Sequence, residues 1–237
     1  MKGQQLPLSV LLPQAPTLEN FFAGPNADVV AGVRALVRRE APSQVLVTGG
    51  PGTGKSHLLQ GAVAAAGEDA RYASLRDADP RELHDVAWLA LDDLDEALEA
   101  ERAIPLLRLV DARRAAGRPL LLAGEAPPSR LPAALADLRT RLSAMLVLAL
   151  KPLRDTDRRE LLRAQARERG LTLPDEVASW LLGHFSRDAG TLLNVLEELD
   201  GAALSAQRRL TLPFAQSVLG PRVQPPLDLE SGRTGPG

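Results

Sequence analysis

Short apolar runs alternate with segments of helical period along the first two thirds of the chain. Apolar runs of this length, bounded by turn residues, are typical of strands buried in a parallel sheet. The intervening segments place apolar residues on one helical face, and the alternation predicts an α/β fold. We expect strands at 45–47, 71–75, 86–91, 120–123 and 145–150, and helices at 29–39, 57–66 and 104–117. The third helix is predicted to start near Ile104 because Pro105 lacks an N–H and suits a first helical turn.

The strand pattern stops after Lys151 and Pro152, and only helical periods follow. We expect helices at 155–169, 174–185, 189–207 and 212–219, which form a small all-helical domain after the sheet. Both ends of the chain are rich in Pro and Gly and lack any period, so we expect them to be disordered. The predicted parts are an arm at 1–17, a nucleotide-binding α/β domain at 18–151, a helical domain at 152–220 and a tail at 221–237.

A phosphate-binding motif lies between the first strand and the second helix. The eight residues from Gly49 to Ser56 match G-x-x-x-x-G-K-[ST] without a mismatch. In such a loop, backbone N–H groups surround a phosphate, Lys55 reaches the β and γ phosphates, and Ser56 can ligate Mg²⁺. A simple glycine-rich turn is the alternative, and the flanking strand and helix disfavour it. The predicted ligands are therefore ADP or ATP with Mg²⁺, bound by Gly49, Gly50, Pro51, Gly52, Thr53, Gly54, Lys55 and Ser56.

Acidic residues follow two of the predicted core strands. Asp92 comes directly after strand 86–91, where a P-loop protein places the carboxylate that holds Mg²⁺ together with Ser56. Asp93 is predicted either to polarise the attacking water or to cap the following turn. Glu125 follows strand 120–123 and is a candidate sensor of the γ phosphate (sensor 1), with a solvated loop carboxylate as the alternative.

Two further segments have a chemistry that depends on a partner. Arg139 and Arg141 lie just before the last strand, at an edge where an arginine finger can reach a neighbouring subunit. Spacing alone equally fits a solvated arginine. The segment Gln5-Leu6-Pro7-Leu8 suits docking as an extended peptide in a partner's hydrophobic groove, and the same leucines can instead fold back on the chain's own core.

Composition narrows the classes of protein. The 237 residues include no cysteine, which excludes disulfides, zinc–thiolate sites and thiol catalysis and fits a cytoplasmic protein. The longest apolar stretch, 144–150, is too short to span a bilayer, so no membrane contact is expected. A net charge of −2 differs from that of a typical nucleic-acid binder, although it leaves local contacts to duplex DNA and a homodimer open. The histidines lack metal-ligand spacing and are expected in structural or surface positions: His57, His84 and His184.

Several segments together resemble a known family. They are residues 5–8, 18–26, 52–59, 92–93, 124–128, 138–142 and 206–214. In this order and spacing they resemble the DnaA-related AAA+ proteins, most closely the Hda family of DnaA regulatory inactivators. The resemblance implies a P-loop AAA+ core followed by a helical lid domain, with His57 included in the nucleotide-binding segment.

The family implies a specific function. Gln5, Leu6 and Leu8 would bind the sliding clamp of DNA polymerase III, its beta subunit. The clamp-bound protein would then contact DnaA carrying ATP and stimulate its hydrolysis, with Arg141 as an arginine finger in trans. The family's own nucleotide is mainly ADP and serves as a structural ligand, so the chain's own turnover is expected to be slow or absent.

One departure from the family concerns the lid. AAA+ lids usually carry a sensor arginine at the start of a helix, where this chain has Gly190, with Arg187 slightly before it. The competing interpretation is an independent AAA+ ATPase, such as a helicase loader or a DnaA-like assembly factor. The intact pairs Lys55-Ser56 and Asp92-Asp93 support that alternative.

Overall fold

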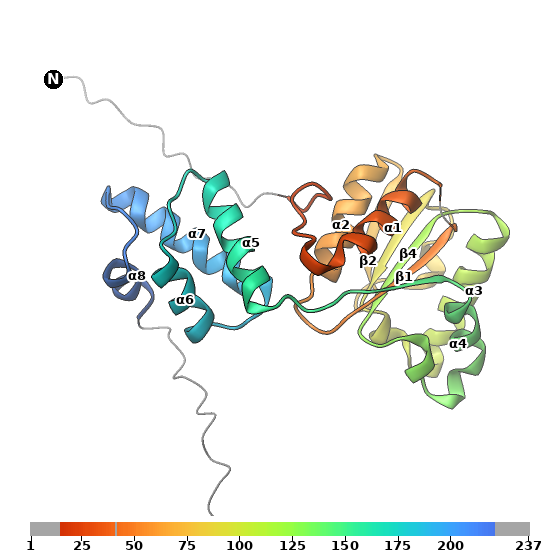
Figure 1. Ribbon diagram of the computed structural model, residues 1–237. Coiled ribbons are helices and arrows are strands. Elements are labelled where there is room, and N and C mark those ends of the chain that lie inside the picture. The colour runs from red at the N-terminus through yellow and green to blue at the C-terminus, as the bar shows by residue number, and fades with distance from the viewer. Residues whose placement is uncertain (1–14, 41, 221–237) are drawn as a thin grey trace, which may run out of the picture.

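The computed structural model describes residues 15–40 and 42–220, and within these ranges it contains a five-stranded parallel sheet. The strand order is β2-β3-β4-β1-β5, with every neighbouring pair parallel (Figure 1). This confirms the predicted α/β class. The strands are β1 (Gln44–Thr48), β2 (Ala70–Ser74), β3 (Trp88–Asp92), β4 (Leu120–Gly124) and β5 (Leu146–Ala149).

Helices cover both faces of the sheet because the central strands are apolar on both sides. Val45 and Val47 of β1 pack with α1 (Ala27–Val37) and α2 (Lys55–Ala66). Leu46 faces the other way, into a core built with α3 (Ala100–Ala115) and α4 (Ala136–Ser143). All five residues of β1, β3 and β4 are buried. The sheet is therefore the middle of three layers.

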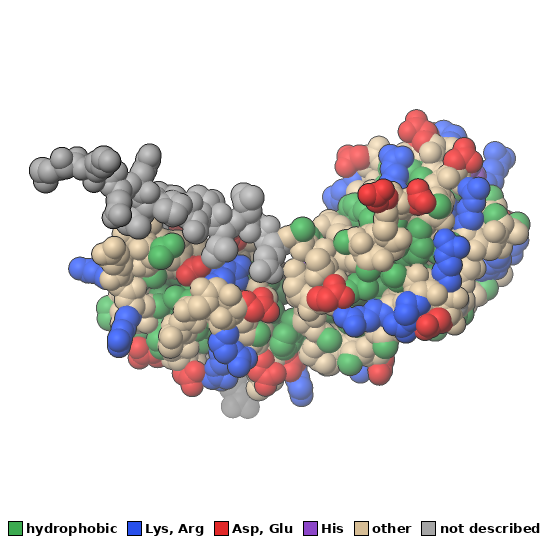
Figure 2. Space-filling model, turned by 90° about the horizontal axis from the view of Figure 1, so that it is seen from above, with side chains coloured by type: hydrophobic (Ala, Val, Ile, Leu, Met, Phe, Trp, Pro, Cys, Tyr) green, Lys and Arg blue, Asp and Glu red, His purple; other side chains and the backbone are tan. Residues whose placement is uncertain are grey.

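The helical part follows the last strand and has its own core. Leu162, Leu181, Leu196 and Leu219 are among the side chains that meet there. Figure 2 shows this part and the sheet part as two lobes joined by a narrower region. On the face shown, acidic and basic side chains are mixed. The helices are α5 (Asp155–Glu168), α6 (Asp175–His184), α7 (Ala189–Ala206) and α8 (Leu212–Leu219).

Two helices near the second face differ from the prediction. Helix α3 begins at Ala100, so Pro105 lies inside it rather than in its first turn. The predicted start near Ile104 is wrong. Pro105 has no N–H, so the helix lacks one backbone hydrogen bond there, and it nevertheless extends back to Ala100. Helix α4 was not predicted, since its single short stretch buries only Leu138 and Leu142 and gives too weak a period.

The segment before α1 is fixed to the second helix. Thr17 and Asn20 exchange hydrogen bonds, in which each backbone N–H is bound by the other's side chain at 2.8 and 3.1 Å. A Cβ on Gly61 of α2 would lie 2.7 Å from the carbonyl carbon of Thr17, so this glycine permits the close contact. Thr17 therefore belongs to the folded part and not to the predicted arm. Among the described residues, no helix has the length and apolar character needed to cross a membrane.

Candidate functional site

The carboxyl ends of β1, β3 and β4 bring the predicted site residues to one edge of the sheet. β4 lies between the other two strands, with Thr48 paired to Gly124 and Leu91 paired to Leu122. The phosphate-binding loop follows β1, and the Gly49 N–H continues the ladder by donating to the Gly124 carbonyl at 3.1 Å. Crevices outside the carboxyl ends of parallel strands are the usual ligand sites of such sheets.

The loop has the backbone form that a phosphate cradle requires. Gly54 has a φ of 94° and precedes Lys55, the first residue of α2, so the loop leads into a helix N-terminus. Lys55 Nζ donates to the carbonyls of Gly49 and Gly50 at 2.7 and 3.1 Å, which places the ammonium group over the loop. Thr53 Oγ1 donates to the Gly50 carbonyl at 2.8 Å and braces the turn. Free N–H groups at a helix N-terminus, together with a lysine, favour binding of an anion.

The lid closes directly on this loop. A Cβ on Gly52 would lie 2.5 Å from the Cβ of Asp188, the residue before α7, and Gly52 also has a φ of 69°. Asp188 is held in place because its Oδ1 accepts from the Thr191 N–H at 2.8 Å and its Oδ2 accepts from the Ser186 hydroxyl at 2.7 Å. A glycine at position 52 is thus required both by the backbone and by the lid.

A hollow of about 470 Å³ lies between the loop and the lid. Arg158 of α5 lines it with a side chain that is only 14% exposed, and its guanidinium donates to Asp155 Oδ1 and to the Arg187 carbonyl. Arg187 also lines the hollow and lies 3.8 Å from Asp155. The remaining lining residues are Pro51, Gly52, Thr53, Pro152, Leu153, Ser186, Asp188 and Ala189.

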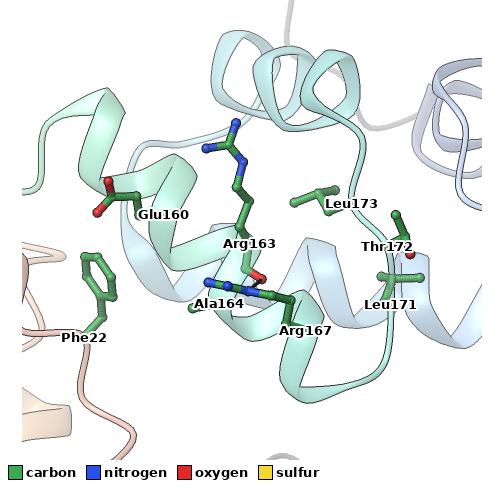
Figure 3. A pocket seen from close by; sticks show the side chains of 8 residues that line it. All are labelled: Phe22, Glu160, Arg163, Ala164, Arg167, Leu171, Thr172 and Leu173. Carbon is green, nitrogen blue, oxygen red and sulfur yellow. Dashed lines mark hydrogen bonds between the residues drawn. The ribbon is translucent and has the colours of Figure 1, made fainter.

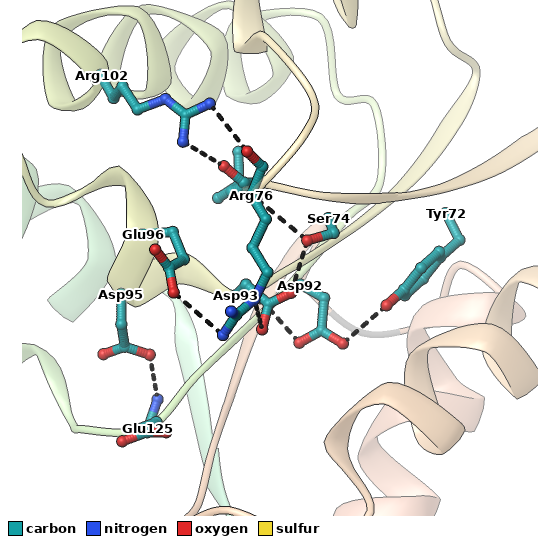
Figure 4. Close-up of polar contacts among 10 residues, drawn as sticks. Tyr72, Ser74, Arg76, Asp92, Asp93, Asp95, Glu96, Arg102 and Glu125 are labelled. Carbon is teal, nitrogen blue, oxygen red and sulfur yellow. Dashed lines mark hydrogen bonds and ion pairs between the residues drawn. The ribbon is translucent and has the colours of Figure 1, made fainter.

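Asp92 is a buried carboxylate whose described hydrogen-bond donors are neutral. It ends β3 and is 1% exposed. Its Oδ2 accepts from the Tyr72 hydroxyl at 3.0 Å, and its Oδ1 accepts from the Asp93 N–H at 2.9 Å (Figure 4). Burial, followed by the adjacent Asp92 charge, raises the pKa of Tyr72 to about 12. A buried carboxylate without a cationic partner among the described residues suits a bound divalent cation.

Asp93 occupies the N-cap position of a short 3-10 helix, with a φ of 57°. Its side chain makes no cap hydrogen bond, so the predicted capping role is wrong for the carboxylate. Instead Oδ2 accepts from Ser74 Oγ at 2.6 Å, and Oδ1 lies 3.3 Å from Nε of Arg76 (Figure 4). Arg76 also pairs with Glu96 at 3.1 Å. These contacts direct the carboxylate toward edge strand β2.

Glu125 follows β4 at the same edge of the sheet. Its backbone N–H donates to Asp95 Oδ2 at 2.7 Å, while the residue as a whole is exposed (Figure 4). The structure therefore brings Glu125 to the strand end where it was expected, with its backbone fixed and its carboxylate toward solvent.

Arg141 lies at the opposite edge of the sheet from the phosphate-binding loop. Its carbonyl accepts from Arg114 Nη2 at 3.2 Å, and Arg114 Nε donates to the side chain of Gln44, the first residue of β1. The loop follows Thr48, the last residue of β1, and five strand residues place these two ends roughly 13 Å apart. In Figure 1, α4 lies on the side of the sheet away from the lid.

Arg139 lies on the same short helix as Arg141 and is half-buried. Within residues 15–40 and 42–220 the Arg139 side chain makes no hydrogen bond or ion pair, whereas Nε of Arg141 donates to Asp111 Oδ1 at 2.7 Å. The predicted clamp-binding residues Gln5, Leu6 and Leu8 lie outside the described residues.

The three histidines have structural contacts. His57 Nε2 lies 2.8 Å from Asn20 Oδ1 and 3.2 Å from the Thr17 carbonyl, and both neighbours are acceptors. Burial lowers the pKa of His57, so the ring is neutral and donates from Nε2. His57 thus holds the segment before α1 against α2 rather than facing the hollow. His184 Nδ1 lies 2.9 Å from the Trp180 carbonyl, and the His84 carbonyl accepts from Arg118.

A second hollow of about 580 Å³ lies on the lid side, away from the phosphate-binding loop. It is bounded by Phe22, by α5 and by the loop before α6 (Figure 3). Arg163 on its wall is paired with Asp175 at 2.7 Å, outside the hollow's lining. None of the predicted site residues borders this hollow.

Sequence reasoning missed several residues of the site. Tyr72 and Asp188 lie far along the chain from Asp92 and Gly52, which they contact, and Arg158 lies far from the loop with which it lines the hollow. None of the three belongs to a recognisable pattern of its own. Asp188 had one indirect signal, because an Asp before a helical period is a common N-cap. Gly190 lies in the first turn of α7, and the described lid residues with a charged guanidinium at the hollow are Arg158 and Arg187.

Comparison with known proteins shows what the lid and the fold are similar to. Residues 155–219 match the family model "Hda, lid domain". The fold is similar to domain III of the Thermotoga maritima replication initiation protein DnaA, with a TM-score of 0.74 and 19% identity over 90% of this chain and 99% of that chain. Residues 155–219 are thus similar to an Hda lid, and the chain as a whole has the fold of the DnaA AAA+ domain.

Other solved AAA+ structures have the same fold. A replication initiator DnaA bound to AMPPCP and single-stranded DNA matches with a TM-score of 0.69 and 22% identity over 79% of this chain. This AAA+ protein spans 65% of the length of that DnaA chain, slightly less than two thirds. A Thermotoga maritima RuvB matches with a TM-score of 0.65 and 15% identity, over 86% of this chain and 71% of that one. The confirmed fold is thus an AAA+ core with a helical lid.

Proposed function

We propose that this chain binds the sliding clamp and stimulates hydrolysis of the ATP bound to DnaA, which returns DnaA to its ADP form. The observation that supports this most directly is the position of Arg141. It lies at the amino ends of the strands, opposite the chain's own phosphate-binding loop, which favours a role for its guanidinium at a neighbour's nucleotide over a role at its own. The Hda-type lid supports the same choice of partner.

An arginine finger acts by stabilising the charge that builds on a transferring phosphoryl group. Arg141 is suited to this role because it is half-exposed, and within the described residues only its Nε is bonded. A guanidinium presents further N–H donors in a fixed fork that matches two phosphate oxygens. Arg141 would therefore complete the triphosphate pocket of DnaA when the two AAA+ cores meet.

The chain's own loop would hold ADP or ATP as a structural ligand. The loop glycines, the helix N-terminus at Lys55 and the hollow beneath the lid fit a nucleotide phosphate. The solved DnaA neighbour bound to AMPPCP supports this assignment. Ser56 and the buried Asp92 would hold Mg²⁺, which would neutralise phosphate charge there. The contacts of Asp93 with Ser74 and Arg76 favour slow turnover in this site.

The residues Gln5, Leu6 and Leu8 would bring the protein to the clamp. An extended peptide with apolar side chains can dock in a hydrophobic groove of a partner. In the proposed function, that groove would belong to the clamp. Recruitment then raises the local concentration of Arg141 near DnaA on DNA, by the same argument that applies to any tethered pair of sites.

The test is ATP hydrolysis by DnaA in the presence of DNA-loaded clamp and this protein. Arg141→Ala is expected to abolish the stimulation, since a finger contributes a factor of about 10³ or more. Arg139→Ala is the matched control from the same helix and should retain it. The double variant Leu6→Ala, Leu8→Ala should lose the part of the stimulation that depends on the clamp. Full stimulation by both the Arg141 variant and the double leucine variant would disprove the proposal.

The independent-ATPase alternative is tested separately on the protein alone. Its own hydrolysis is compared with that of Lys55→Ala, because the lysine contacts the β and γ phosphates in any authentic P-loop enzyme. Fast turnover that depends on Lys55, without an effect on DnaA, would favour the alternative.

A further inference from the structure

Helix α3 contacts both the backbone carbonyl and the guanidinium of Arg141. Asp111 Oδ1 accepts from Arg141 Nε at 2.7 Å, and Arg114 Nη2 donates to the Arg141 carbonyl at 3.2 Å. Asp111 and Arg114 are three residues apart on α3, so they lie on the same side of that helix. One helix therefore fixes both the backbone and the guanidinium of Arg141.

This grip rests on the buried sheet. Arg114 Nε donates to Gln44 Oε1 at 2.9 Å, and Gln44 Nε2 donates to the Val110 carbonyl of α3 at 2.8 Å. Gln44 is 3% exposed and begins β1, the strand that also leads into the phosphate-binding loop. A buried amide whose nitrogen and oxygen are both hydrogen-bonded cannot move without losing bonds that water does not replace. The backbone of Arg141 is therefore linked through Arg114 to Gln44, a residue of the buried sheet.

The way Asp111 binds leaves the working end of the guanidinium free. The carboxylate takes Nε, on the stem side of the group, while Nη1 and Nη2 have no partner among residues 15–40 and 42–220. These two nitrogens are the ones that face outward in a bidentate contact with phosphate oxygens.

We propose that Asp111 is a positioning residue for Arg141, which fixes the direction of the guanidinium before a partner's nucleotide arrives. The inference rests on the proposed function in trans. A long arginine side chain loses rotational freedom when it docks, and a preset orientation removes part of that cost at the reacting geometry. Asp111 then raises the maximal rate of stimulated hydrolysis and does not change how tightly the partners associate.

A structural role alone would give a different result. Both side chains of the pair are 43% exposed, and exposed ion pairs contribute little to the stability of a folded protein. The loss of Asp111 is therefore expected to leave the unfolding midpoint nearly unchanged. A change confined to the maximal rate of the partner reaction separates positioning from folding and from docking.

The experiment uses the full chain with DnaA–ATP and DNA-loaded clamp, and varies the chain's concentration to obtain the maximal rate and the half-saturating concentration. Asp111→Ala should lower the maximal rate on the order of 10- to 100-fold, with the half-saturating concentration unchanged. Asp111→Asn should retain most of the rate, because its amide oxygen still accepts from Nε. Asp137→Ala is the matched control, an exposed acid on α4 without a contact in the described part of the chain.

A second measurement covers the case in which Asp111→Ala disturbs folding. The urea-unfolding midpoint of Asp111→Ala should equal that of the wild type, because both side chains of the pair are 43% exposed. An Asp111→Ala protein with the wild-type rate, a faster rate or only a shifted half-saturating concentration would overturn the positioning role, while loss in Arg141→Ala would still uphold the proposed function. An Arg141→Ala protein with full stimulation would remove the arginine finger in trans and, with it, the positioning role of Asp111.

Discussion

Ser74 Oγ donates a hydrogen bond of 2.6 Å to Asp93 Oδ2, which ties edge strand β2 to the acid that follows β3. With Nε of Arg76 3.3 Å from Oδ1, both oxygens of this carboxylate are engaged. A base that polarises water needs a free oxygen within hydrogen-bond reach of that water. In the proposed function, this arrangement would keep the chain's own hydrolysis of a bound nucleotide slow.

Releasing Asp93 should raise the chain's own ATP hydrolysis. Ser74→Ala combined with Arg76→Ala removes both contacts and frees the Asp93 carboxylate, so the single-turnover rate should rise severalfold. The control is Arg71→Ala. Arg71 is an exposed arginine of β2 whose side chain makes no hydrogen bond or ion pair among the described residues. An unchanged rate in the double variant would show that Asp93 does not limit turnover. The gain should disappear when Lys55→Ala is added.

The single tyrosine permits a direct pH test of the Asp92 environment. Burial and then Asp92 raise the pKa of Tyr72 to about 12, above its ordinary value of about 10. The contribution to stability is therefore complete below pH 10 and is lost as the pH rises from about 10 to about 12. Because the chain has one tyrosine, phenolate absorbance titrates Tyr72 alone. Asp92→Asn should lower the midpoint of this titration, and Asp95→Asn should leave it in place.

The buried Arg113 should contribute strongly to stability. It is 1% exposed and donates to the carbonyls of Val86 and Pro119 at 2.8 and 2.6 Å, which ties α3 to the amino ends of β3 and β4. Arg113→Met would remove both of these bonds, leaving the Pro119 carbonyl only the 3.3 Å bond from the Leu89 N–H, and should lower the free energy of unfolding by roughly 2–4 kcal/mol. Arg108→Met, on the exposed side of the same helix, should change it by less than about 0.5 kcal/mol. Urea unfolding compares the two variants.

Gly61 and Gly183 form a matched pair of helical glycines. A Cβ at Gly61 would lie 2.7 Å from the carbonyl carbon of Thr17 and 2.8 Å from the Leu18 nitrogen, so the segment before α1 must shift. Gly61→Ala should destabilise the protein by roughly 1–3 kcal/mol, despite the better helix propensity of alanine. Gly183→Ala, with open space at its Cβ, should stabilise it by up to about 1 kcal/mol. Equal denaturation midpoints for both variants would contradict the close packing at Thr17.

The sequence predicts the sheet well because each core strand is a short apolar run buried on both faces. The helix that contains Pro105 shows where local rules fail, since a first-turn preference is only statistical and the packing of α3 on the sheet is stronger. Helix α4 buries too few residues to produce a period.

The site was predicted where a motif lies within a few consecutive residues. The phosphate-binding loop and Asp92 are local, and their strands bring them to one edge. The pairing of Arg141 with Asp111 spans 30 residues, and the contact of Gly52 with Asp188 joins the loop to the lid. Neither could be inferred without the tertiary structure. The same holds for Asp93, whose predicted capping role was replaced by contacts from a neighbouring strand.

Because Asp188 lies close to Gly52, the substitutions that the phosphate-binding loop tolerates depend on the residues of the turn before α7. Any side chain at position 52 must displace the lid as well as adopt a left-handed backbone, so substitutions there are expected to be accepted only together with a smaller or rearranged turn before α7. Directed libraries that vary the loop alone will therefore sample mostly inactive molecules, whereas libraries that vary the loop and residues 186–190 together contain the compensated ones.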